Sequence, residues 1–257
     1  MDRFWSAPPV SRTIVAVMGI ESLLVIGGIM PIYWVHFEPS LMWKLPPHVW
    51  RLASSFLLTG GGLSFIFDLY FTWIYGTGLE LNSPRFSQPG DFFVYVVFNM
   101  LVILATAGFL LKAYIFTSAL IMAFIYTFSQ DNRGTKAHFV IFQIPVELLP
   151  WATLALTLVL AGPGSAAVQG MGIISAHLYD FLTRLYPTFQ GGSNWVQTPM
   201  FVKRAFGADR TSFAHKKYGT SVRPGQPIPQ QQSRGWTSGF SGGGWSGRGQ
   251  GHRLGNG

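Results

Sequence analysis

Long apolar runs alternate with short polar stretches along this chain as far as residue 186. The hydrocarbon core of a bilayer is about 30 Å thick, so a helix needs roughly 20 apolar residues to cross it. Six runs approach that length: Thr13–Trp34, Ala53–Gly76, Phe92–Leu111, Ala113–Phe128, His138–Ala161 and Ser165–Tyr186. The pattern therefore predicts an all-α membrane protein with six transmembrane helices.

The remainder of the chain reads differently. Residues 187–257 are rich in Gly, Ser, Pro and Gln and hold few apolar side chains. Such a segment cannot bury enough apolar surface to offset its ordering entropy, and it is predicted to be a disordered tail. The expected organisation is a short N-terminal segment over residues 1–12, a six-helix domain over 13–186 and the tail over 187–257.

Composition supports the membrane assignment. Only 11% of the residues are charged, against roughly 25% in soluble domains, and the mean hydropathy is +0.31. The chain has no cysteine, which excludes disulfides, thiolate metal sites and a cysteine nucleophile. No metal or cofactor is expected.

Positive charge is distributed unevenly over the predicted loops. The net charge is +8, and nine of the eighteen Lys and Arg residues lie in the tail, between Lys203 and Arg253. With six spans, fifteen of the eighteen fall on the side of both termini, so both termini are predicted to be cytosolic. The basic tail is interpreted as a solvated segment near anionic lipid. An RNA-binding tail is the weaker alternative because few Arg-Gly pairs occur, and nucleic acid is not an expected partner.

Four ionisable residues fall near the middle of the predicted spans, where each costs roughly 2.5 kcal/mol or more. They are Glu21, Asp68, Glu147 and His177, and Asn99 adds a polar amide. Each of these side chains could form a hydrogen bond between two helices, worth about 0.6 kcal/mol on average. Together with two prolines in the fifth span, Pro145 and Pro150, they favour a partly hydrated interior.

The sixth span holds a pair of small residues, Gly172 and Ala176, followed at once by His177. Two small residues four positions apart allow close approach of another helix, although ordinary packing explains most such pairs. A histidine beside a tight crossing would suit the base of an intramembrane hydrolase. The matching nucleophile is missing: Ser118 has none of the glycines that an exposed serine with an oxyanion site requires. Catalysis by that route is not expected.

These motifs together resemble the Derlin family, the catalytically inactive relatives of rhomboid proteases in the endoplasmic reticulum. The resemblance rests on Trp50-Arg51 in the first loop, on the segment from Gly172 to Leu182, and on the juxtamembrane Thr198-Pro199. Ala176 stands where the family has a second glycine, and Asp68 where it often has asparagine. The resemblance implies a rhomboid-like fold that lacks protease activity.

Near its C-terminal end the chain resembles the SHP box, a peptide that binds the AAA unfoldase called valosin-containing protein. The SHP-like box covers residues 247–255, and the bulky anchor usual before the Gly-x-Gly is absent. Trp245 is the nearest substitute. The implied unfoldase-binding residues are Trp245, Gly249, Gly251, Arg253 and Leu254.

The resemblance implies a non-catalytic retrotranslocation factor in endoplasmic-reticulum-associated degradation. The expected partners are misfolded client proteins, the AAA unfoldase, a membrane ubiquitin ligase complex, the lipid bilayer and a second copy of the chain. Local thinning of the bilayer would ease the passage of polar client segments. Two alternatives remain: an active rhomboid serine protease, and a transporter or channel through Glu21, Asp68 and Glu147.

Overall fold

The computed structural model describes residues 7–42, 48–139, 142–190 and 196–207. The chain divides into two units, Met1–Ser212 and Phe213–Gly257, and the whole second unit lies outside the described residues. The predicted SHP-like box lies there too, with Trp245, Gly249, Gly251, Arg253 and Leu254.

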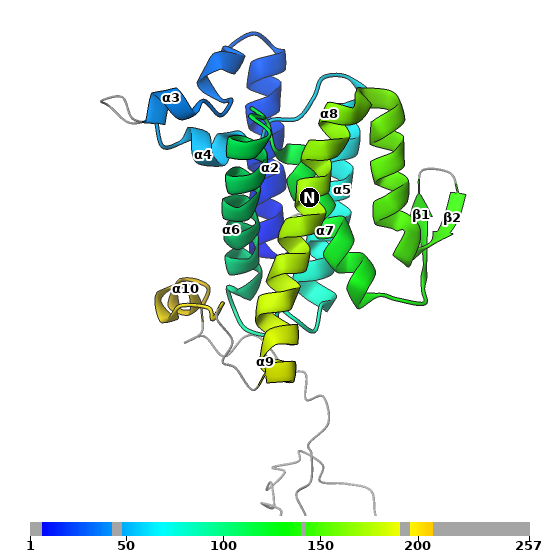
Figure 1. The fold of residues 1–257 in the computed structure, drawn as a ribbon. Coiled ribbons are helices and arrows are strands. Elements are labelled where there is room, and N and C mark those ends of the chain that lie inside the picture. Colours follow the sequence, from blue (N-terminus) through cyan, green and yellow to red (C-terminus); the bar gives the residue numbers. More distant parts are fainter. Residues whose placement is uncertain (1–6, 43–47, 140–141, 191–195, 208–257) are drawn as a thin grey trace, which may run out of the picture. The chain divides into compact units, whose positions relative to one another are not determined.

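Five long helices form the body of the protein (Figure 1). They are α2 (Pro9–Ile26), α5 (Leu63–Asn82), α6 (Asp91–Ile103), α7 (Thr117–Asp131) and α8 (Leu149–Asp180). A π-helix, η2 (Leu104–Leu110), extends α6, and a second one, η4 (Phe181–Leu185), extends α8 into the short α9 (Tyr186–Gln190).

Helix α8 consists of two arms that meet at Gly162. Gly162 has φ 85° and ψ 174°, a non-helical conformation that glycine tolerates, and Pro163 follows it. The arm of residues 149–161 and the arm of residues 163–180 run in opposite directions (Figure 1). The described chain thus contains six helical rods that alternate in direction, in keeping with the six predicted segments.

Within the part of the chain that the structure describes, three helical stretches are long and apolar enough to cross a membrane on their own. They are Pro9–Ile26, Asp91–Leu110 and Val146–Thr188, the last of which contains the break at Gly162. The prediction of a mainly helical membrane protein is confirmed. That all six rods cross the bilayer stays a prediction.

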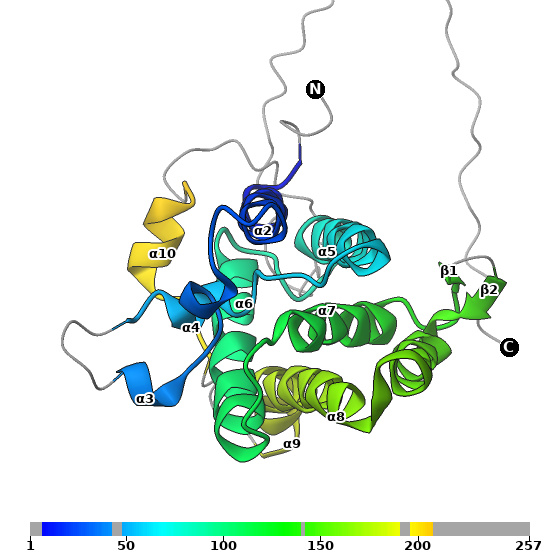
Figure 2. The same ribbon diagram turned by 90° about the horizontal axis from the view of Figure 1, so that it is seen from above.

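Helix α7 lies at the centre of the bundle. Figure 2 shows it between α5 on one side and α8 on the other, with α6 alongside. Two-thirds of its residues are buried, among them Leu120, Met122 and Phe124. Phe92 and Tyr95 of α6 pack against Phe124 with ring centroids 5.6 and 6.1 Å away. The apolar core is therefore built around α7.

The first loop, where residues 30–42 and 48–62 are described, holds three short helices: η1 (Ile32–Trp34), α3 (Pro39–Met42) and α4 (Arg51–Ser54). It is fixed to the body of the protein by backbone hydrogen bonds, from Phe37 N to Tyr114 O at 2.9 Å and from Phe116 N to Ser55 O at 2.8 Å. Lys112, in the tight turn predicted between the third and fourth helices, has φ 53°.

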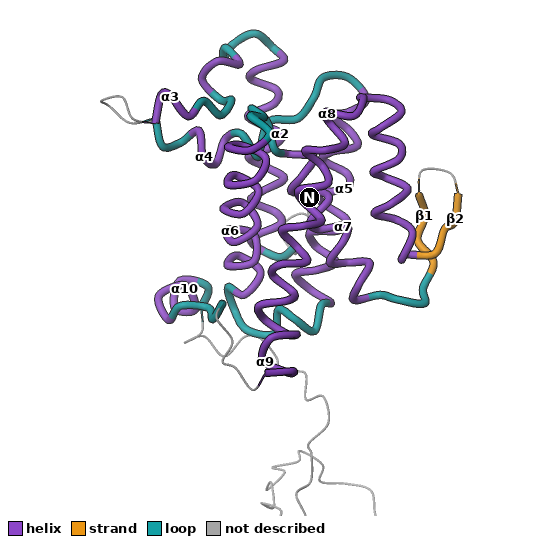
Figure 3. Tube along the Cα trace, in the orientation of Figure 1, coloured by secondary structure: helices purple, strands orange, loops and turns teal. Residues whose placement is uncertain are grey.

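The predicted second and fifth spans differ most from the structure. The second helix begins at Leu63 instead of Ala53, because Gly62 takes φ 67°, which is not helical, directly before the helix. The fifth begins at Leu149 instead of His138. Before it lies an antiparallel hairpin of β1 (Lys136–Phe139) and β2 (Phe142–Pro145), beside the first arm of α8 (Figure 3). Phe139, Phe142 and Ile144 lie in its strands, and such residues suit strands as well as apolar helices.

The prolines of the fifth span do not interrupt a helix either. Pro145 ends β2, and Pro150 lies in the first turn of α8, where the missing N–H is not needed. The two prolines therefore give no support to the partly hydrated interior predicted from the sequence.

The predicted disordered tail also begins too early. Pro187 to Gln190 belong to α9, and a further helix, α10 (Met200–Ala205), buries Val202, which is 5% exposed. Five of the seven residues from 200 to 206 are hydrophobic, and Val202 and Phe206 have partners at the beginning of α6, which the composition of the tail as a whole does not reveal.

Candidate functional site

Helix α7 and the second arm of α8 cross tightly at Gly172. A side chain at this position would overlap the backbone carbonyl of Ala119 and press on Met122. Ala176, one turn later, is 1% exposed. The two small residues therefore bring α8 against the backbone of α7, the close crossing for which such pairs are suited.

A buried hydrogen-bond chain joins α6 to the same face of α8. Ser175 Oγ donates to Asn99 Oδ1 at 2.8 Å, and Asn99 Nδ2 donates to the carbonyl of Tyr95 at 2.8 Å. Asn99 and Ser175 are both fully buried. Asn99 thus satisfies its amide inside the protein and joins two helices.

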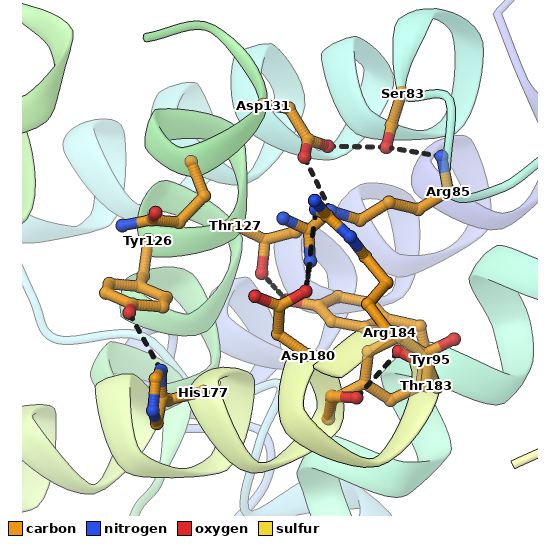
Figure 4. A network of polar contacts seen from close by, with 12 residues as sticks. Ser83, Arg85, Tyr95, Tyr126, Thr127, Asp131, His177, Asp180, Thr183 and Arg184 are labelled. Atoms are coloured by element: carbon orange, nitrogen blue, oxygen red, sulfur yellow. Dashed lines mark hydrogen bonds and ion pairs between the residues drawn. The ribbon is translucent and has the colours of Figure 1, made fainter. Parts of the chain in front are cut away.

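His177 is exposed on α8 and bonds a tyrosine. Its Nδ1 lies 3.1 Å from the hydroxyl of Tyr126 on α7 (Figure 4). Tyr126 lies eight residues after Ser118 on the same helix, a distance of about 12 Å at about 1.5 Å per residue. The hydrogen bond of His177 therefore reaches α7 about two turns away from Ser118.

A buried ion-pair network closes the end of the bundle at which α7 and α8 finish (Figure 4). Arg85 Nε donates to Asp131 Oδ1 at 2.5 Å, and Arg85 Nη1 donates to Asp180 Oδ1 at 2.6 Å. The side chains of Arg85 and Asp131 are only 6% and 4% exposed. Ser83 Oγ donates to the second oxygen of Asp131 at 2.5 Å. One guanidinium thus connects the loop after α5 to the ends of α7 and α8.

A polar cavity of about 780 Å³ opens beside this network. Cations and carboxylates line it together, since Arg85, Arg184 and Lys203 face Asp91 and Asp131. Further lining residues are Pro84, Ser87, Gln88, Gln130, Tyr179, Thr183, Val196, Gln197 and Thr198. With three cations and two carboxylates, the lining carries charges of both signs and a formal charge of +1.

At the opposite end of the bundle, Trp50 and Arg51 hold the first loop together. Arg51 is 1% exposed, donates from Nη1 to the carbonyl of His36 at 3.0 Å, and lies 4.7 Å from the ring centre of Tyr33. Trp50 Nε1 donates to the carbonyl of Trp34 at 3.2 Å. Both motif residues therefore bind carbonyls of the loop's first half.

The other predicted polar residues, Glu21, Asp68 and Glu147, form no hydrogen bond with one another in the described structure. Glu21 is half-buried on α2, and its Oε1 is enclosed without a hydrogen-bond partner among the described residues. Asp68, on α5, accepts a hydrogen bond from Ser64 Oγ at 3.2 Å. Glu147, predicted inside the fifth span, is exposed in the turn η3 (Val146–Leu148), just before α8, so it does not lie within the helix.

Several apolar helices, joined by hydrogen bonds and ion pairs between their polar side chains, define a polytopic helical membrane protein. The model of the Der1-like family matches residues 7–200, and the chain belongs to this family. It is 27% identical to Derlin-1 of mouse and of human over 261 residues, which covers 100% of this chain and 94% of each relative. It is equally similar, at 27%, to a probable derlin-1 homolog of Dictyostelium discoideum, with 98% of this chain and 97% of that protein covered.

The sequence did not reveal the network around Arg85. Arg85 lies in a short loop, and Asp131 and Asp180 lie near the ends of separate helices, where charged residues are common. Only the parallel packing of α7 and the second arm of α8 brings the two carboxylates to one guanidinium. The sequence did hold one usable signal. Asp131 and Asp180 lie near the C-terminal ends of the fourth and sixth helices, and six helices that alternate in direction bring these two ends to the same side of the membrane.

Proposed function

We propose that this protein is a non-catalytic retrotranslocation factor of endoplasmic-reticulum-associated degradation, located in the endoplasmic-reticulum membrane. Membership of the Der1-like family and similarity to proteins named Derlin-1 support this role. The single observation that carries the non-catalytic part is the hydrogen bond of His177 with Tyr126 in place of a serine.

A hydrolase would need the imidazole within reach of a nucleophile, at about 2.6–3.2 Å. His177 instead meets Tyr126, and Ser118 lies on the first turn of α7 at the other end of the helix. We therefore propose that the rhomboid-like fold deforms the membrane and does not cleave peptide bonds. The alternative function is that of an active rhomboid protease.

The first arm of α8 supports membrane thinning. Residues 149–161 would span about 20 Å at about 1.5 Å per residue, less than the roughly 30 Å of the hydrocarbon core. Most of this arm is exposed, including Trp151, Val159 and Leu160. A short lipid-facing helix draws the bilayer thinner around it, which would ease the passage of polar client segments.

The distribution of cations supports cytosolic termini. Arg85, Arg133, Lys136 and Arg184 lie by the bundle end that also holds the start of α2, whereas Arg51 and Lys112 lie by the opposite end. Cytosolic loops carry the excess of Lys and Arg. The tail beyond residue 207 would then bring an AAA unfoldase from the cytosol through Gly249, Gly251, Arg253 and Leu254, with Trp245 as a further anchor.

The test is degradation of a misfolded endoplasmic-reticulum client in cells lacking the endogenous protein. The intact chain and a His177→Ala variant are expected to restore the client's turnover, while Leu254→Ala restores little of it. A tail peptide of residues 236–257 should capture the unfoldase, and the same peptide with Leu254→Ala should not. Labelling of Ser118 by a fluorophosphonate probe, or loss of client turnover with His177→Ala, would favour the protease instead. Flux of a small solute in proteoliposomes without any client would favour a transporter.

A further inference from the structure

Helix α10 is attached to the beginning of α6. Val202 is buried there against Gly90, where an added Cβ would lie 2.7 Å from Val202 Cγ1. Gly90 has φ 87°, so glycine provides both the left-handed turn and the space. The docking of α10 therefore depends on the absence of a side chain at the residue just before α6.

Two further contacts fix the same docking. Thr198 Oγ1 donates to Asp91 Oδ1 at 2.5 Å, and the rings of Phe206 and Phe93 pack with centroids 5.6 Å apart. These contacts flank α10 on both sides along the chain. The helix is therefore held at one place by a hydrogen bond, an apolar pair and a fitted glycine.

The place of docking sets the depth of α10 in the membrane. Asp91–Leu110 is the most apolar of the three candidate spans, with a mean hydropathy of 2.3, and it begins at Asp91. A helix fixed to Asp91 and Phe93 therefore lies where headgroups meet hydrocarbon. Figures 1 and 2 show α10 lying across the end of α6 instead of along it.

The remaining faces of α10 differ in chemistry. Successive residues of a helix are turned by about 100°, so Phe201 and Lys203 lie on opposite flanks of the buried Val202. Lys203 lines the polar cavity, and Phe201 is 73% exposed on the flank turned away from it. Met200, 65% exposed, and Arg204 share the outer face.

We propose that α10 is an interfacial lipid anchor that binds the anionic surface of the protein's own bilayer. Phe201 and Met200 insert at the boundary of headgroups and acyl chains, as the apolar face of an interfacial helix does. Lys203 and Arg204 attract anionic headgroup phosphates, with about a fivefold preference per cation near the surface. Contact with the beginning of the candidate span Asp91–Leu110 and the two adjacent cations favour lipid over a second protein as the occupant. The inference does not depend on a role in retrotranslocation.

The absence of native cysteine permits a direct test on the full chain. A nitroxide is attached at Phe201→Cys and, as the matched control, at Gln197→Cys, which is exposed on the cavity side. The protein is placed in nanodiscs of phosphatidylcholine with phosphatidylserine. Collisions with apolar oxygen should exceed those with a water-soluble nickel chelate at position 201, and the order should reverse at position 197. Equal nickel access at both positions would overturn the proposal. So would shielding of position 201 from both reagents, because this would place protein on that flank.

A second variant separates the charges from the apolar flank. In the Phe201→Cys background, removing phosphatidylserine should make the label shallower, and Lys203→Gln with Arg204→Gln should abolish this difference. A difference of the same size in the charge-neutral variant would show that the two cations do not bind anionic lipid, and would sink that part of the proposal.

Discussion

Glu80 of α5 caps the beginning of α2 by accepting three hydrogen bonds, two of them from Ser11. Its Oε2 accepts from the backbone nitrogen of Ser11 at 2.8 Å and from Ser11 Oγ at 2.7 Å, while Oε1 accepts from Val10 N at 3.0 Å. The first N–H groups of a helix have no partner within it and carry partial positive charge. Helix α2 has no acidic residue in its own first turn, so a carboxylate from another helix takes that role.

Replacing Glu80 by Gln should destabilise the protein by about 1–3 kcal/mol, because an amide presents one donor to N–H groups that need an acceptor. Ser11→Ala removes only the hydroxyl contact, and we expect a loss of about 1 kcal/mol or less. Both free energies can be measured by unfolding in dodecyl sulfate mixed micelles, followed by circular dichroism. Equal stability of Glu80→Gln and the unaltered chain would contradict the capping role.

A pair of glycines two positions apart tests the helix crossing. Gly172→Ala forces a Cβ into the carbonyl of Ala119, a backbone atom that cannot rotate away, and should cost about 1–3 kcal/mol. Gly170, on the same helix, has nothing within 4 Å of an added Cβ. Gly170→Ala should therefore be neutral or stabilise α8 by up to about 1 kcal/mol, because alanine favours the helix. The same unfolding measurement applies, and similar losses in both variants would mean that the crossing does not explain the effect.

The ion-pair network gives a third prediction. Arg85→Gln leaves Asp131 buried without its guanidinium, and breaking a buried pair in this way costs about 3–5 kcal/mol. Arg184 also reaches Asp180, at 3.5 Å, but its side chain is 59% exposed. Arg184→Gln should therefore change the stability by less than about 1 kcal/mol. A small loss for Arg85→Gln, no larger than that for Arg184→Gln, would show that the network does not hold the ends of α7 and α8 together.

The sequence predicted the features that depend on neighbouring residues and missed those that depend on contacts between distant parts of the chain. Apolar run length located the six helical rods, and the small pair Gly172 and Ala176 predicted a close crossing, because both signals are local. The start of the fifth helix was placed too early because a β-hairpin and an apolar helix use similar residues. Arg85 with Asp131, and Glu80 with Ser11, are separated by 46 and 69 positions and follow only from the packing. The interior polar residues were treated as one group, although the structure gives Asn99 two partners and leaves Glu147 exposed.

The docking of α10 can be tested without altering α10. Gly90 and Gly134 both have positive φ, 87° and 81°, so alanine should strain the backbone similarly at each. Only at Gly90 does the added Cβ meet another segment, Val202, while nothing lies within 4 Å at Gly134. Gly90→Ala should therefore release α10 in addition to the shared strain.

Trypsin cleavage after Lys203 and Arg204 measures this release, because a docked helix must open before a protease can bind it. Cleavage of the full chain in detergent should be several times faster in Gly90→Ala than in Gly134→Ala, and the latter should match the unaltered protein. If both variants were cleaved at the unaltered rate, Val202 would not need the space at Gly90, and α10 would be held by the contacts of Asp91 and Phe93 alone. Acceleration of the same size in both variants would instead point to general loosening of the fold by backbone strain.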